Sequence, residues 1–291
     1  MATAEVVAAA LPRTADRGRS GRGRLVTGLV LVALVLAASL LGPLVWRSDP
    51  LAQDLGSILA APSAAHPLGT DQLGRDSLAR VLAGGRTSLA LTLPAAALAT
   101  LLGLLAAVVA VARDGRLDSV VGRISDVQLA IPSLLVAIVV VVFTERGTGP
   151  LLAVLVLSSW VLPFRLLRTA LTRVLAQPFV EAAQVSGLPW RRVVRRHLLP
   201  AVLPHLVVVS TLVLGGVLVL STSLGYLGVG VRPPTPEWGR LVAEGQSQLG
   251  VAWWISFAPG TALVLLLVGT QLLGDWFADR HSLHAVLGRS A

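Results

Sequence analysis

The sequence predicts an all-α integral membrane protein with six transmembrane helices. Of its 291 residues, 54% are hydrophobic and only 13% are charged, which is the balance of a membrane protein. Six apolar runs approach the roughly 20 residues that a helix needs to cross about 30 Å of hydrocarbon. The runs are continuous rather than alternating, which excludes the strand pattern of a membrane β-barrel. Helices therefore remain, because they satisfy their own backbone hydrogen bonds in lipid.

The six runs fix where the spans are expected. In chain order they are Leu25–Trp46, a stretch within Thr87–Ala112, Ile124–Phe143, Gly147–Phe164, Ala201–Leu224 and Ile255–Leu273. The first run is too long for the core of a signal peptide and no small-residue cleavage site follows it directly, so we expect it to be retained. The fourth run is the shortest. Trp253 and Trp254 precede the sixth run as an expected interfacial anchor.

The placement of the arginines predicts the orientation. All 24 basic residues are arginine, and all but seven of them lie in the two tails, the second-to-third connection and the fourth-to-fifth connection. Cytoplasmic segments carry the excess of arginine, so both termini are expected in the cytoplasm of a multi-pass cell-membrane (inner or plasma membrane) protein. Residues 1–24 form a basic tail that we expect to be disordered, and residues 276–291 a cytoplasmic C-terminal tail. The net charge of +9 then reflects topology and predicts no nucleic-acid partner.

Two missing residue types exclude several kinds of chemistry. The chain has no cysteine, which excludes disulfides, thiolate metal sites and cysteine nucleophiles. It also has no lysine, and a P-loop requires one, so the chain cannot form a standard ATPase site. We therefore expect no catalytic residue, no metal and no cofactor in this chain, which would be a transport subunit and not an enzyme. Any ATP-driven work must come from a partner.

A basic segment between the fourth and fifth runs has the features of a helix pair on the surface. Glu181 follows a proline in the first turn of a helix-compatible stretch, where a negative charge is favourable. The small side chains of Ala182 and Ala183 let another surface approach the backbone. Gly187 permits a reversal of the chain, and Pro189 suits the first turn of a second helix. The arginines that follow are Arg191, Arg192, Arg195 and Arg196.

This spacing resembles the EAA loop of permease subunits of binding-protein-dependent ABC importers. The matching residues are Glu181, Ala182, Ala183, Gly187, Arg191, Arg192, His197 and Pro200. The resemblance implies that residues 178–200 form a coupling loop, which receives mechanical work from an ATPase made as a separate chain. Gln184 and Ala201 depart from the family pattern, in which a basic residue and an asparagine are common. The plainer alternative is a basic loop that only fixes topology.

Two strings outside the membrane resemble a narrower group, the second permease subunit of dipeptide, oligopeptide and nickel importers. The first string precedes the second run and contributes His66, Gly69, Thr70, Asp71, Gly74, Arg75 and Asp76. The second string lies between the fifth and sixth runs and contributes Pro234, Trp238 and Gly239. The resemblance covers roughly residues 20 to 276, and its signature residues belong to extracytoplasmic loops.

This resemblance carries implications for fold and partners. It implies the type I ABC importer permease fold over residues 25–275, a six-span permease domain. It also implies a heterodimer with a second, homologous permease subunit, two ABC ATPase subunits that hold ATP and Mg, an extracytoplasmic substrate-binding protein, and a lipid bilayer around the spans. The imported solute would be a dipeptide, an oligopeptide or a nickel-type compound, and the sequence does not choose among them.

Three alternative functions make different demands on the sequence. His66, Asp71 and Asp76 could bind a metal, but Asp and Gly at this spacing favour turns. An ion-coupled secondary transporter would need acids at membrane depth or helices broken in inverted halves. Asp126 is the one acid close to a run, and we expect Arg123, three residues earlier, to pair with it. An intramembrane enzyme would need a nucleophile and a base at one depth, and the five histidines are scattered.

Overall fold

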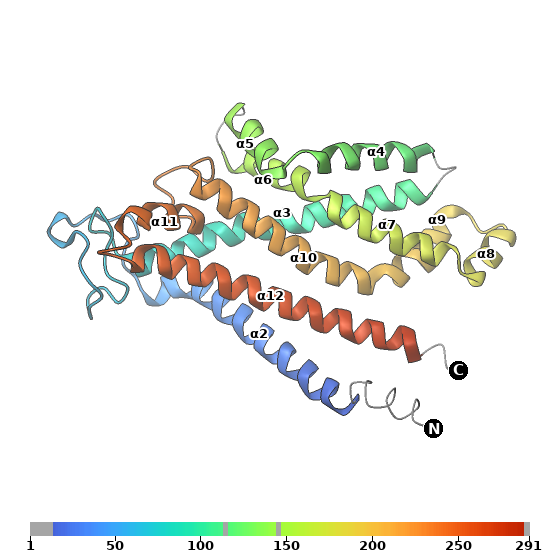
Figure 1. Ribbon diagram of the computed structural model, residues 1–291, viewed down its shortest axis with the longest axis horizontal. Coiled ribbons are helices and arrows are strands. Elements are labelled where there is room, and N and C mark those ends of the chain that lie inside the picture. Colours follow the sequence, from blue (N-terminus) through green and yellow to red (C-terminus); the bar gives the residue numbers. More distant parts are fainter. Residues whose placement is uncertain (1–13, 113–115, 144–146, 288–291) are drawn as a thin grey trace, which may run out of the picture.

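The computed structural model describes residues 14–112, 116–143 and 147–287, and these form a bundle of helices (Figure 1). In chain order the elements are α2 (Thr14–Val45), η1 (Leu55–Ser57), α3 (Ser77–Val111), α4 (Arg116–Ala130), α5 (Ser133–Phe143), α6 (Thr148–Ser159), α7 (Val161–Leu175), α8 (Pro178–Val185), α9 (Trp190–Val193), η2 (Val194–Leu198), α10 (Leu199–Tyr226), α11 (Trp238–Gly245), η3 (Gln246–Gln248) and α12 (Trp254–Leu287). Within the described ranges there is no β-strand, which confirms the all-α class.

Four helices are long and apolar enough to cross a membrane unbroken. They are Gly21–Val45, Ser77–Val111, Trp190–Tyr226 and Trp254–Arg280. These four contain the first, second, fifth and sixth expected spans. Two helix pairs, α4 with α5 and α6 with α7, meet the same criterion only when each bent pair is counted as one span. The described residues therefore hold four to six candidate spans.

The third and fourth expected spans are not straight helices, and proline chemistry explains the first break. α4 and α5 meet at 89°, on either side of Ile131 and Pro132. Proline has no N–H to donate and disfavours the helical conformation of the residue before it, so one helix ends and another begins there. α6 and α7 meet at 40° at Trp160. Pro163 then occupies the first turn of α7, where proline is tolerated.

Small residues on α3 let the central helices pack closely. Ala95, Ala99 and Ala107 are fully buried in the main core, which α3 shares with α6, α7 and α10. A Cβ atom on Gly103 would lie only 2.7 Å from the backbone nitrogen of Phe164 at the start of α7. Close backbone approach of this kind is how helices associate in lipid, where apolar side chains have no advantage over lipid tails.

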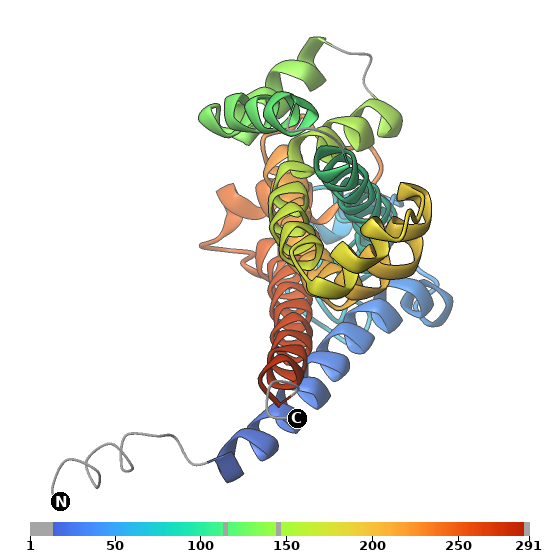
Figure 2. The same cartoon turned by 90° about the vertical axis from the view of Figure 1, so that its right-hand side faces the viewer.

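α2 and α12 pack against each other on one side of the bundle, while α4 and α5 lie on the opposite side (Figure 2). Glycine again permits the contact, because a Cβ on Gly28 would lie 3.0 Å from the carbonyl oxygen of Gly269. Near the start of α2, the guanidinium of Arg24 donates to Asp279 of α12 at 2.9 Å.

Parts of both tails are helical. Residues 14–24, expected to be disordered, form the first turns of α2, and residues 276–287 continue α12. Once an apolar span has formed a helix, adding flanking residues to it avoids the free-energy cost of nucleation. The Arg24–Asp279 ion pair also joins the two extensions. Residues 1–13 of the expected N-terminal tail and residues 288–291 lie outside the described residues.

The bundle has two distinct ends. The start of α2, the end of α12, and helices α8 and α9 lie at one end, here called the α9 end (Figure 1). Residues 46–76 and α11 lie at the other end, here called the α11 end. Residues 178–200 therefore lie at one end of the bundle, and the two strings that resemble extracytoplasmic loops lie at the other.

Candidate functional site

Residues 178–200, here called the α8–α9 segment, fold as the helix pair that the sequence predicts. Gly187 has a φ of +75°, in the left-handed region that favours glycine. The turn around it closes α8: the backbone N–H of Leu188 donates to the carbonyl of Ala183 at 3.1 Å, and that of Ser186 to the carbonyl of Ala182 at 2.9 Å. This is the common glycine-terminated helix end. The segment thus has a defined shape.

Three buried side chains fix the α8–α9 segment to the bundle. Val180, Val193 and Leu198 each have no exposed surface and belong to the same core as α3, α7 and α10. The rings of Phe179 and His197 also meet, with their centroids 5.8 Å apart, and this contact ties α8 to η2. A force applied to the segment would therefore reach the central helices through packed contacts.

The outward side of the segment is left open. Glu181 and Ala182 are exposed, and Ala183 is half-buried. Val185, at the end of α8, is 84% exposed. Arg191 and Arg192 are exposed on α9, and Pro200 is exposed in the first turn of α10. Except for the half-buried His197 and Ala183, the predicted coupling residues form an exposed surface on a buried base.

One feature of the segment was not predicted. Between α9 and α10 the chain forms the π-helical turn η2, with five residues from Val194 to Leu198. Single π turns inside helices often mark functional positions. The sequence has no local signal for it, since the residue types around it suit an ordinary α-helix.

At the α11 end, the histidine and one aspartate of the first string act as folding residues. Asp76 is buried and caps α3, accepting from the backbone N–H of Ala79 at 2.8 Å. Its carboxylate also lies 2.9 Å from the His66 ring and accepts from Trp46 at 3.2 Å. The string thus fastens the end of α2 and the loop to the start of α3.

The other aspartate of the string, Asp71, forms ion pairs with two arginines. The Asp71 carboxylate accepts from Arg75 at 2.7 Å and also from the guanidinium of Arg80, which is almost fully buried. Arg80 also forms an ion pair with Glu244 of α11 at 2.8 Å, and Glu244 accepts from Arg240 at 2.9 Å. Although burial opposes its ionisation, the hydrogen bond and charge of Arg80 set the pKa of Glu244 below its ordinary value. None of these long-range pairs was predicted from the sequence.

Backbone shape accounts for the remaining residues of the first string. Gly69 and Gly74 have φ angles of +62° and +70°, and a Cβ on Gly69 would lie 2.6 Å from the carbonyl oxygen of Ala60. The carbonyl of Thr70 accepts from the indole of Trp254 at 3.1 Å. In the part of the chain that the structure describes, no three His, Cys, Asp or Glu side chains gather as a metal site. The loop residues are thus engaged in folding contacts.

The second string docks α11 onto α3 and α10. Trp238 is buried and donates through its indole to the carbonyl of Val81 at 2.9 Å. The neighbouring Glu237 is also buried and caps α11, accepting from the backbone N–H of Gly239 at 2.9 Å. Burial raises the pKa of Glu237 above its ordinary value. A Cβ on Gly239 would lie 2.3 Å from the carbonyl oxygen of Thr222, so α11 contacts α10 backbone to backbone. Pro234 is exposed before this helix.

Asp126 does not pair with Arg123 as expected. Its carboxylate accepts from Arg165 of α7, and Asp118 accepts from Arg168 of the same helix. The bend at Pro132 sets α4 alongside α7, so the arginines of α7 lie closer than the one on the same helix. Both acids of α4 are thus used to hold α4 against α7.

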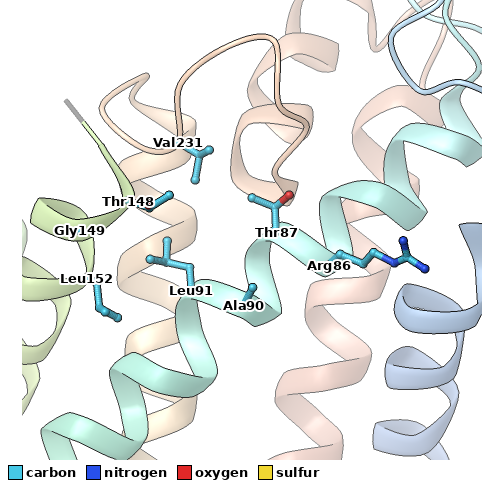
Figure 3. A pocket seen from close by; sticks show the side chains of 8 residues that line it. All are labelled: Arg86, Thr87, Ala90, Leu91, Thr148, Gly149, Leu152 and Val231. Carbon is cyan, nitrogen blue, oxygen red and sulfur yellow. The ribbon is translucent and has the colours of Figure 1, made fainter.

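A cavity of about 570 Å³ lies between α3, α6 and the chain at Val231 (Figure 3). Leu91, Leu152 and Val231 contribute apolar side chains to its wall. Arg86 also lines it, but its guanidinium points away toward α2, where it donates to the carbonyl of Ser39 at 3.1 Å. The cavity therefore has the apolar walls expected between helices and no free charge from Arg86.

Comparison with known proteins gives consistent matches. A family model described as the binding-protein-dependent transport system inner membrane component matches residues 99–282. A probable D,D-dipeptide transport system permease of Escherichia coli K12 is 35% identical over 244 residues, covering 82% of this chain and 80% of that protein. A nickel transport system permease of the same organism is 33% identical over 238 residues, covering 82% and 86%.

A third relative and a solved structure extend these matches. A di/tripeptide transport system permease of Pseudomonas aeruginosa is 33% identical over 250 residues, covering 83% of this chain and 82% of that protein. The methionine ABC transporter MetNI, solved in inward-facing conformations, has a chain with a TM-score of 0.56 and 22% identity. That match covers 67% of this chain and 93% of the other, and it shows a shared fold.

Proposed function

The chain belongs to the family of binding-protein-dependent transport system inner membrane components, the ABC importer permeases of the peptide and nickel group, and from this premise we propose how it works. The protein is a multi-pass membrane subunit that translocates a solute. ATP and Mg are held by two separate ABC ATPase subunits. The α8–α9 segment receives their movement and passes it to the spans.

One observation carries this proposal. The α8–α9 segment exposes Glu181, Ala182 and Val185 while Val180 and Leu198 anchor it in the main core. A helix that is exposed on one face and packed against the core on the other can pass a displacement from a partner into the core. Since the same core includes α3, α7 and α10, displacement of α8 would tilt the helices around it.

The proposed cycle is alternating access. Closure of the two ATPase subunits on ATP pushes the α8–α9 segments, and the translocation path opens outward to receive solute. The path forms between this subunit and a second, homologous permease. With the α8–α9 segment in the cytoplasm, the start of α2 and the end of α12 lie on the same side, and the α11 end faces outward.

The outward end is proposed to meet an extracytoplasmic substrate-binding protein. Buried ion pairs of Arg80 with Asp71 and Glu244 join α11 to the loop before α3, so that end forms one firm layer. Relatives named for D,D-dipeptide, di/tripeptide and nickel transport support a dipeptide, an oligopeptide or a nickel-type solute as the cargo.

Co-purification from native membranes tests this assignment. We expect the solubilised chain to carry a second permease and P-loop ATPase subunits, and cross-linking at the α11 end to capture a binding protein. Solute uptake into vesicles of the assembled complex should require ATP and not an ion gradient. A chain that purifies alone and drives uptake from an ion gradient would contradict the proposal and support an ion-coupled secondary transporter.

A further inference from the structure

Four arginines of the α8–α9 segment surround a cavity at the α9 end. The cavity has a volume of about 500 Å³, within the roughly 300–1,000 Å³ of small-molecule sites. It is lined by Pro189, Arg191, Arg192, Arg195 and Arg196. The arginines are spaced one and four residues apart, so the helical turns of α9 and η2 place them on one side. The cavity is therefore a concentration of positive charge.

These guanidinium groups are available for a ligand. Within the described ranges of the chain, none of the four has an ion-pair or hydrogen-bond partner, whereas Arg24, Arg75, Arg80, Arg165, Arg168 and Arg240 each pair with an acid. All four are exposed. Arginines held together without a counter-charge repel one another, and a bound anion would relieve that repulsion. The guanidinium fork is matched to phosphate, which it can bind through two parallel hydrogen bonds.

The cavity also lies where the membrane begins. From Leu198 to Tyr226 the chain contains no Asp, Glu or Arg, and Arg196 precedes Leu198 by two residues, about 3 Å along the helix. Trp190, half-buried beside Arg191, is of the type that is enriched at membrane interfaces. Arginine clusters directly next to a span on the cytoplasmic side attract anionic lipid.

We propose that Arg191, Arg192, Arg195 and Arg196 form a binding site for a phosphate-bearing anion at the membrane edge, with the headgroup of an anionic phospholipid as its source. All lining residues lie at or after Pro189, whereas Glu181 and Ala182 lie on α8. The site therefore shares Arg191 and Arg192 with the predicted coupling residues and leaves out Glu181 and Ala182. A bound headgroup would brace η2 at the point where the coupling segment joins α10.

Native mass spectrometry of the full chain in a neutral detergent tests this site. The probes are phosphatidylglycerol, phosphatidylcholine of the same acyl chains, and inorganic phosphate as a competitor. Phosphatidylglycerol should bind more tightly than phosphatidylcholine. The Arg195→Gln/Arg196→Gln variant should bind phosphatidylglycerol roughly thirtyfold more weakly, whereas Arg195→Lys/Arg196→Lys, which keeps the charge but loses the guanidinium fork, should bind with an affinity between that of the wild type and that of the Gln variant.

A matched control removes the same charge elsewhere at the α9 end. Arg22 and Arg116 are exposed on α2 and α4, and Arg22→Gln/Arg116→Gln should bind phosphatidylglycerol as the wild type does. If millimolar phosphate competes but the two lipids bind equally, the anion site stands and free phosphate is its source. Equal phosphatidylglycerol binding by the Arg195→Gln/Arg196→Gln variant and the wild type would overturn the proposal.

Measuring both ATPase and phospholipid retention in the assembled complex distinguishes a lipid-binding site from an ATPase-binding site. If Arg195→Gln/Arg196→Gln releases the ATPase subunits while phospholipid retention is unchanged, the arginines bind protein, and the lipid proposal is overturned. The lipid assay needs neither ATP nor transport, so its failure leaves the proposed function standing. Loss of the coupling function in turn leaves the lipid result standing.

Discussion

Arg80, near the start of α3, forms an ion pair with Glu244 of α11 at 2.8 Å, and the pair joins two segments that are far apart in the sequence. Arg80 is almost fully buried, and Glu244 is also shared with Arg240. This contact fastens the loop before α3 to the connection between α10 and α12. The α11 end consequently depends on a small number of charged side chains.

Replacement of Glu244 with Gln should destabilise the protein. The change leaves a buried guanidinium with only Asp71 as a partner, and breaking one side of a buried ion pair costs about 3 kcal/mol. Thermal unfolding of the detergent-solubilised chain measures this. Asp49→Asn, on an exposed acid at the same end, should change the free energy of unfolding by less than about 0.5 kcal/mol. Equal effects of the two substitutions would contradict the role of Glu244.

The raised pKa of Glu237 predicts a pH dependence of stability. Its folded-state pKa is above the ordinary value of 4.5, so the folded state favours the protonated acid. The stability it contributes is complete below pH 4.5 and falls as the pH rises through the folded-state pKa. Glu237→Gln, which does not titrate, should gain stability relative to the wild type as the pH increases.

Unfolding midpoints of the wild type and Glu237→Gln from pH 4 to pH 8 measure this difference. Glu244 provides the opposite sign, because its lowered pKa gives stability that is present above pH 4.5 and lost as the pH falls through the folded-state pKa. The stability of Glu244→Gln relative to the wild type should therefore decrease as the pH rises. A constant offset between Glu237→Gln and the wild type at every pH would show that Glu237 does not titrate in this way.

Gly239→Ala should displace α11 from α10. The added Cβ would lie 2.3 Å from the carbonyl oxygen of Thr222, a backbone atom that cannot move aside alone. Such overpacking costs about 2 kcal/mol. Gly250→Ala is the matched control, since nothing lies within 4 Å of its added Cβ. Thermal unfolding of both variants decides the point, and equal midpoints would mean that α11 is not tightly docked.

The sequence predicts the local chemistry of this protein better than its long-range contacts. The turn at Gly187 and the folding role of Asp76 follow from neighbouring residues, and both are present. Proline chemistry indicates the break at Pro132, whereas the continuous apolar run around it predicts one unbroken span. Arg80 and Glu244 could not be paired in advance, since nothing in either string indicates which distant segment lies beside it.

Asp126 illustrates the same limit. A partner three residues away on one helix is the natural expectation, and Arg123 occupies that position. The bend between α4 and α5 instead sets α4 along α7, so that Arg165 is the partner. The π-helical turn η2 also depends on packing at both of its ends, through the buried Val193 and Leu198. Sequence patterns do not record such tertiary choices.

Substitutions of Gly187 should separate backbone shape from side-chain contact. Its φ of +75° is accessible to Asn but strained for Val, by about 1–2 kcal/mol, and nothing lies within 4 Å of an added Cβ. Gly187→Val should reorient α8 and lower ATP-driven uptake several-fold at equal membrane insertion, whereas Gly187→Asn should transport nearly normally. If both variants transport at the wild-type rate, the shape of this turn is not needed for coupling.

The central claim is that α8 transmits work from the ATPase subunits, and Glu181→Lys tests it most directly. The measurement is solute imported per ATP hydrolysed by the assembled complex in proteoliposomes. Asp49→Lys, the same charge change at the α11 end, is the control. The account predicts that Glu181→Lys lowers this ratio at least about tenfold, while Asp49→Lys leaves it unchanged. A wild-type ratio for Glu181→Lys would contradict the account.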